Sequence, residues 1–212
     1  MSTVVLIDYG SGNLRSAEKA LARAAEGKGC DVVVSAEPEV VAKADRLVLP
    51  GVGAFAACMG LLHAKDGLIP AMTEAVKDRG APFMGICVGM QLLGDRGLEF
   101  GETPGLGWIA GDVRKIERTS PELKVPHMGW NALSKPRRHP VTASIPEGGH
   151  VYFTHSYILD ARDPSDVIAW TDHGSRFVAA VARGNVAGMQ FHPEKSQANG
   201  IRLLGDFLEW RP

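Results

Sequence analysis

The chain has 212 residues, a length that suits one domain with a large core, and its 45% apolar and 22% charged residues are ordinary for a globular protein. A formal net charge of -1 excludes a strongly basic surface for nucleic acid or an anionic membrane. No apolar run approaches the ~20 residues that a membrane-spanning helix needs. The three cysteines are widely spaced, which argues against a disulfide framework and favours a reducing, cytoplasmic location.

The first half of the chain alternates strand and helix signals. Strands are predicted at residues 3–9, 30–35, 46–50 and 82–86, and helices at 13–26, from Pro38, within 51–62 and at 70–79. This alternation is typical of βαβ units, so it predicts an α/β fold with a mixed, mostly parallel sheet flanked by helices. Binding sites in such sheets lie at the carboxyl ends of the strands.

The second half has closely spaced strand candidates at residues 150–159, 166–170, 177–183 and 186–191, and it closes with a helix at 197–210. The short spacing favours antiparallel strands joined to the parallel core. The sequence shows no internal repeat and no long linker, so a single domain over residues 1–212 is expected.

Cys87 lies at the junction between the predicted strand 82–86 and a predicted helix at 88–93, with Gly85 and Gly89 on either side. A sharp strand-to-helix turn exposes a nucleophile and directs the next backbone N–H, here that of Val88, toward a developing oxyanion. A helix N-terminus and a nearby histidine would favour the reactive thiolate. From this turn alone, an inert buried cysteine is an equally good interpretation.

His192 follows the last predicted strand, and Glu194 lies two residues later, on the same side of an extended chain. A carboxylate in that position can hold the imidazole in one tautomer and stabilise its charged form. Cys87, His192 and Glu194 therefore predict a Cys-His-Glu catalytic triad. The sequence has no CxxC pair and no HExxH motif, so metal ligation has little support.

The strings GICVGMQLL (85–93) and HPEKS (192–196) resemble the class I, triad-type glutamine amidotransferases. The strings IDYGSGNL (7–14) and PHMGWN (126–131) resemble the subfamily that serves as glutaminase subunit of imidazole glycerol phosphate synthase. The resemblance implies a flavodoxin-like fold and hydrolysis of L-glutamine through a cysteinyl thioester, with no bound cofactor or metal needed. It also implies a heterodimer in which ammonia passes to a (β/α)₈-barrel cyclase subunit during L-histidine biosynthesis.

The resemblance implies further site residues. The backbone N–H groups of Val52 and Val88 would form the oxyanion hole, and the loop 50–53 would become productive only when the partner is engaged. Glutamine would be held by Gly53, Gln91, Glu99, Ser156 and Tyr157, and the partner would be met by Asn13, Trp130 and Lys195. Structural interpretations stay open for several of these: a surface loop for Glu99, a buried indole for Trp130 and a helix cap for Asn13.

Three alternatives remain at the level of sequence. The chain could serve another triad amidotransferase, such as anthranilate synthase. It could be a cysteine hydrolase of similar fold, although in those a histidine often follows the cysteine and here Val88 does. It could also be a non-catalytic binding subunit, against which the intact triad argues.

Overall fold

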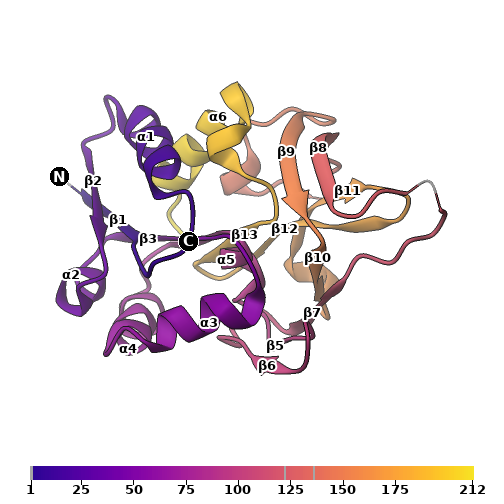
Figure 1. Ribbon diagram of the computed structural model, residues 1–212. Helices are drawn as coiled ribbons and strands as arrows, with labels where there is room; N and C mark the ends of the chain where they lie inside the picture. The colour runs from indigo at the N-terminus through magenta and orange to yellow at the C-terminus, as the bar shows by residue number, and fades with distance from the viewer. Residues whose placement is uncertain (1, 122, 136) are drawn as a thin grey trace.

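A computed structural model describes residues 2–121, 123–135 and 137–212. Its centre is a seven-stranded sheet in the order β11-β12-β13-β4-β3-β1-β2. Helices α1 and α6 lie on one side of this sheet, and α2, α3 and α4 lie on the other (Figure 1). Among the residues described, no helix combines the length and the apolar character needed to cross a membrane.

The first half of the chain builds the parallel part of the sheet. Its elements are β1 (Ser2–Ile7), α1 (Leu14–Ala25), β2 (Cys30–Ser35), α2 (Pro38–Ala42), β3 (Arg46–Gly51), α3 (Phe55–His63), α4 (Leu68–Thr73), β4 (Phe83–Cys87) and α5 (Val88–Gln91). Strands β1, β2, β3 and β4 pair in parallel, and β13 pairs in parallel with β4. The resulting order β2-β1-β3-β4-β13 is flavodoxin-like, which confirms the predicted fold class.

Every residue of β3 and β4 is buried because helices cover both faces of the sheet. This explains why the sequence shows continuous apolar runs there instead of an alternating pattern. One hydrophobic cluster extends from Val4 to Trp210 and joins the sheet to both helical layers.

The second half adds β5 (Arg96–Gly97), β6 (Thr103–Pro104), β7 (Gly111–Lys115), β8 (His127–Ala132), β9 (His150–His155), β10 (Tyr157–Ala161), β11 (Val167–Asp172), β12 (Arg176–Arg183), β13 (Val186–Met189) and α6 (Gln197–Glu209). Strand β12 runs antiparallel to both β11 and β13, as the sequence predicts. A second sheet has the order β10-β7-β5-β6, and β8 and β9 form a separate antiparallel pair.

Three predicted elements differ in the structure. Residues 150–159 form two strands instead of one, since β9 pairs with β8 while β10 pairs with β7. The break falls at Ser156, where Nδ1 of His155 donates to the carbonyl oxygen of Tyr157 at 2.9 Å. The helix predicted at 70–79 begins at Leu68 and continues from Glu74 to Asp78 as a π-helical turn. Helix α5 is shorter than predicted, because the N–H of Leu93 already bonds to the carbonyl of Met90, three residues back.

Candidate active site

Cys87 is the last residue of β4 and directly precedes α5. Its φ of 55° and ψ of -112° lie where non-glycine residues rarely occur, so the backbone is strained at this residue. The flanking glycines make the turn possible. A Cβ at Gly89 would lie 1.9 Å from the carbonyl oxygen of Leu49, and one at Gly85 would lie 2.3 Å from that of Gly89. Helix α5 therefore packs directly on the backbone of β3 and β4.

His192 and Glu194 form a buried hydrogen-bonded pair just beyond β13. Nδ1 of His192 lies 2.8 Å from Oε1 of Glu194, and the two side chains are 3% and 4% exposed. The backbone of His192 is also fixed, because its N–H donates to Tyr152 and its carbonyl accepts from the hydroxyl of Ser196. The bond to Glu194 leaves Nε2 as the ring nitrogen available for chemistry, and Nε2 has no other hydrogen-bond partner within the described chain.

Electrostatics link this pair to the cysteine. Burial acts to lower the pKa of His192, but its interactions with Cys87 and Glu194 outweigh burial and raise the pKa to about 9. A pKa near 9 favours the protonated form of the imidazole at neutral pH. The structure brings together the three side chains that the sequence singles out, although Cys87 and His192 are far apart in the chain.

Cys87 and His192 line one cavity of about 240 Å³. This volume is below the ~300–1,000 Å³ of sites for drug-sized ligands and suits a molecule of amino-acid size. All the oxyanion and substrate residues expected from the sequence line the same cavity. The lining residues are Val52, Gly53, Cys87, Val88, Gln91, Glu99, Thr154, His155, Ser156, Tyr157, His192 and Lys195.

Two of the expected substrate residues have structural partners as well. Gln91 is buried, and its Nε2 donates to the carbonyl oxygen of Tyr157 at 2.8 Å and to Oε1 of Gln190 at 3.1 Å. Glu99 is half-buried, and its Oε2 accepts the N–H of Phe55 at 2.8 Å, at the start of α3. The carboxylate of Glu99 thus ties its loop to a helix N-terminus, so this residue is not part of a free surface loop.

The two expected oxyanion donors differ in availability. Val88 is the first residue of α5, so its N–H has no carbonyl one helical turn earlier to pair with. The N–H of Val52 donates to Oγ of Ser11 at 3.1 Å, and the same hydroxyl donates to the carbonyl oxygen of Val52 at 2.8 Å. In this conformation Val52 is engaged by Ser11 and its N–H is not free for a substrate. Gly53, with φ of 99°, follows Val52 directly.

The residues expected to meet a partner are all exposed. Trp130 is 46% exposed and packs edge-on against Tyr152 with ring centroids 6.0 Å apart, so the interpretation as a buried core indole is wrong. Lys195 lies beside the same tyrosine, with Nζ 5.7 Å from the ring centroid. Asn13 occupies the position before α1, but its side chain makes no capping hydrogen bond.

Sequence reasoning missed two residues that contact the site. Nε2 of Gln190 lies 3.9 Å from Sγ of Cys87, and Ser11 holds Val52. Gln190 could have been noticed as a polar residue inside the apolar strand predicted at 186–191, two residues before His192. Ser11 carried no comparable signal, because its contact with the loop 50–53 joins residues that are far apart in the sequence.

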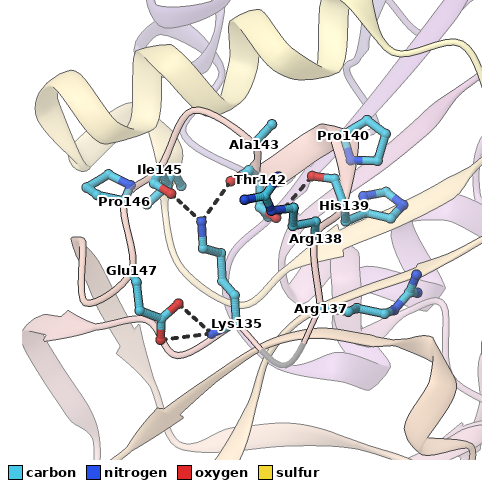
Figure 2. Close-up of a pocket in the computed structure, with 10 residues that line it drawn as sticks. All are labelled: Lys135, Arg137, Arg138, His139, Pro140, Thr142, Ala143, Ile145, Pro146 and Glu147. Atoms are coloured by element: carbon cyan, nitrogen blue, oxygen red, sulfur yellow. Dashed lines mark hydrogen bonds between the residues drawn. The ribbon is translucent and has the colours of Figure 1, made fainter.

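The protein has larger hollows than the triad cavity. One of about 780 Å³ lies beneath α6 (Figure 2), and it is lined by Lys135, Arg137, Arg138, His139, Pro140, Thr142, Ala143, Ile145, Pro146 and Glu147. Nζ of Lys135 points at the carbonyl oxygens of Thr142 and Ile145, and the carboxylate of Glu147 accepts the Lys135 N–H. The residues drawn there contain no nucleophile paired with a base, so the smaller cavity at Cys87 is the candidate for chemistry.

Comparison with known proteins agrees with this geometry. A family model described as glutamine amidotransferase class-I matches residues 5–209. A protein of Caulobacter vibrioides named imidazole glycerol phosphate synthase subunit HisH is 60% identical over 214 residues, covering 100% of each chain. A protein of Rhodospirillum rubrum with the same name is 53% identical and covers 99% of each chain.

Solved structures extend the likeness in fold. The structure of PurLQS from Thermotoga maritima has a TM-score of 0.73 at 21% identity and covers 98% of both chains. A structure titled glutamine amidotransferase has a TM-score of 0.72 at 19% identity, covering 98% of this chain and 99% of the other. The family match spans nearly the whole sequence, and these structures share its fold. The chain belongs to the class-I glutamine amidotransferase family.

Proposed function

We propose that this chain is the glutaminase subunit of an imidazole glycerol phosphate synthase, which hydrolyses L-glutamine to L-glutamate and ammonia. One observation carries the proposal. Cys87, on a strained strand-to-helix turn, shares a cavity with the His192–Glu194 pair in a chain 60% identical over its full length to a HisH subunit. Ammonia production then belongs to L-histidine biosynthesis, as the name of that relative indicates.

In the proposed reaction the sulfur of Cys87 attacks the side-chain carboxamide carbon of glutamine. His192 donates its proton to the nitrogen as the carbon–nitrogen bond breaks, and ammonia leaves with a thioester remaining on Cys87. His192 then accepts a proton from water, which attacks the thioester and releases glutamate. The raised pKa of His192, about 9, supports its role as the acid in the first step, and Glu194 stabilises the charged ring.

The tetrahedral intermediates need donors for their oxyanion. The N–H of Val88 is one, and that of Val52 is the second after the loop 50–53 has turned its peptide away from Ser11. Loss of one such donor costs about 10²–10³ in rate. The proposed function therefore includes a low basal activity for the isolated chain, which rises when a partner reorganises this loop.

The remaining cavity residues are proposed to hold glutamine. Glu99 has a second carboxylate oxygen in addition to the one that bonds Phe55, and it can receive the substrate ammonium group. Gly53, Gln91, Ser156 and Tyr157 line the cavity and would contact the rest of the substrate. Their backbone groups and the rigid Gln91 amide suit a short polar ligand.

The proposed partner is a (β/α)₈-barrel cyclase subunit in a heterodimer. Trp130 and Lys195 lie around Tyr152 next to the cavity, and Lys195 forms no ion pair with any residue in the described ranges, so it is available to a carboxylate of the partner. Asn13 would contact the same partner. We further propose a single domain over residues 1–212, supported by the continuous core, and a cytoplasmic location, supported by the free cysteines.

The test is Cys87→Ala assayed together with the cyclase subunit. The variant should lose glutamine-dependent synthesis and keep synthesis from added ammonia, because only the nucleophile is removed. Cys30→Ala, at a half-buried cysteine on β2, is the matched control and should keep both activities. Unchanged glutamine turnover in Cys87→Ala would sink the proposal.

A further inference from the structure

Gln190 is a fully buried polar side chain that the reaction described above does not use. It follows β13 and precedes His192 by two residues, and its N–H donates to the carbonyl oxygen of Ala179 at 2.9 Å. Its side-chain amide reaches in two directions. Nε2 lies 3.9 Å from Sγ of Cys87, and Oε1 lies 3.1 Å from Nε2 of Gln91.

The orientation of both amides follows from their neighbours. The carbonyl oxygen of Tyr157 can only accept, so the Gln91 atom 2.8 Å from it must be the nitrogen. That nitrogen uses its second hydrogen on Gln190, and therefore the Gln190 atom facing it must be the oxygen. The Gln190 nitrogen is then the atom left to face Cys87.

The Tyr157 carbonyl is itself held from a second side. Nδ1 of His155 donates to it at 2.9 Å, and Nε2 of His155 pairs with Nδ1 of His127 at 3.1 Å. Since both side chains are buried, the acceptor for Gln91 is fixed before any substrate enters. The amide of Gln190 is consequently aimed at the sulfur by a rigid hydrogen-bonded chain.

A donor aimed at sulfur acts differently on the two forms of a cysteine. A thiolate is a strong acceptor and a thiol a weak one, so an amide N–H favours the thiolate. The effect is larger in a buried site, where few other dipoles compete. An amide also adds no charge and takes no proton, so it leaves proton transfer near the sulfur to His192.

We propose that Gln190 is a further catalytic residue, whose side-chain amide donates to Sγ of Cys87 and stabilises the thiolate for attack. This rests on the proposed function in one respect: the thiolate is taken to be the nucleophile toward glutamine. The contact itself concerns the reactivity of Cys87 and is measurable without glutamine.

The experiment measures alkylation of Cys87 by iodoacetamide between pH 5 and 10, scored on the Cys87 peptide by mass spectrometry. Gln190→Glu keeps the side-chain length and an oxygen for Gln91 to donate to, but it replaces the donor by an acceptor. The expected result is a midpoint of the pH profile at least one unit higher and alkylation at pH 7 slower by about tenfold or more. Gln190→Met, which removes the donor without adding charge, should slow alkylation by about three- to tenfold.

Asn185→Asp is the matched control. Its Nδ2 donates to the carbonyl oxygens of Val76 and Ala81, at the opposite end of β13 from Gln190, so the same amide-to-acid change should leave the alkylation profile of Cys87 unaltered. Circular dichroism checks that each variant folds. If Gln190→Glu does not fold, Gln190→Met alone decides.

A wild-type alkylation profile in a folded Gln190→Glu or Gln190→Met variant overturns the assignment. Glutaminase assays of the same variants with the cyclase partner separate this outcome from failure of the proposed function. If the wild-type complex does not use glutamine, the proposed function fails, while the alkylation profile still reports whether Gln190 acts on the sulfur.

Discussion

The two hydrogen bonds between Ser11 and Val52 lead to a quantitative prediction about the loop 50–53. The Ser11 hydroxyl accepts from the N–H of Val52 at 3.1 Å and donates to its carbonyl oxygen at 2.8 Å. Ser11→Ala removes both bonds without adding bulk. The substitution should therefore favour a loop conformation in which the Val52 N–H is free to face the substrate.

The size of the effect follows from the two bonds. A hydrogen bond between neutral groups contributes about 1 kcal/mol net, so two contribute about 2 kcal/mol. Since 1.4 kcal/mol is a factor of ten, the productive conformation should gain up to about 30-fold in population. This is an upper limit, because Sγ of Cys58 also contacts the Val52 carbonyl, at 3.4 Å, and stays in place.

The assay is glutaminase turnover by the isolated chain and by the complex with the cyclase subunit. Ser11→Ala should raise turnover of the isolated chain by about 3- to 30-fold and change that of the complex less than about twofold, because the partner is proposed to free the loop already. Ser35→Ala is the control, since Ser35 also accepts a backbone N–H, that of Glu37, far from the cavity. Unchanged or lower turnover of the isolated Ser11→Ala chain would refute the idea that these two hydrogen bonds limit activity.

Three further predictions follow from the charges and exposure of the site. Glu194→Gln keeps the shape of the side chain but removes the charge next to His192, so the pKa of His192 should fall in an NMR titration and glutamine turnover should drop at least ~10²-fold. Retained turnover would contradict the role of Glu194. Burial lowers the pKa of His155 to about 3 and those of His127 and His139 to about 4, so stability present above pH 6.5 should be lost as the pH falls, by up to ~1.4 kcal/mol per pH unit for each group in urea unfolding. The raised pKa of His192 instead contributes stability that is lost between pH 6.5 and about 9, and a flat profile from pH 4 to 6.5 would argue against neutral buried histidines. Trp130→Ala should weaken partner binding by ~30-fold in calorimetry with little change in melting temperature, because its ring is half exposed, and equal affinity would exclude Trp130 as an interface anchor.

The parallel half of the fold could be predicted because each strand and helix is a separate, strongly patterned segment. Strands β3 and β4 are apolar throughout and lie between turns rich in glycine and proline. The second sheet was missed for the opposite reason. Strands β5 and β6 have two residues each, too few to show any alternation, and they form because β7 and a loop bring them together.

The meeting of Cys87 and His192 could be predicted for a reason that does not extend to their surroundings. Cys87 ends β4 and His192 lies just beyond the end of β13, and these two parallel strands are neighbours, so their carboxyl ends meet. That rule locates side chains at strand ends to within a few ångströms. It contains nothing about which amide faces the sulfur or which hydroxyl holds a loop, because these depend on side-chain orientation.

The contacts of Gln190 and Ser11 therefore define the orientation of two hydrogen-bond donors, which Cys87, His192 and Glu194 alone do not define. In the proposed triad, Cys87 and His192 line one cavity, and Glu194 bonds to His192. Gln190 aims a donor at the nucleophile through buried amides that no substrate needs to order, so the sulfur side of the site is preorganised. Ser11 has the opposite effect on the oxyanion side, because hydrogen bonds of modest strength keep the N–H of Val52, a residue that is 45% exposed, away from the substrate. A site with a rigid nucleophile and a movable oxyanion donor can stay nearly inactive alone and still respond to a small input of binding energy at the loop.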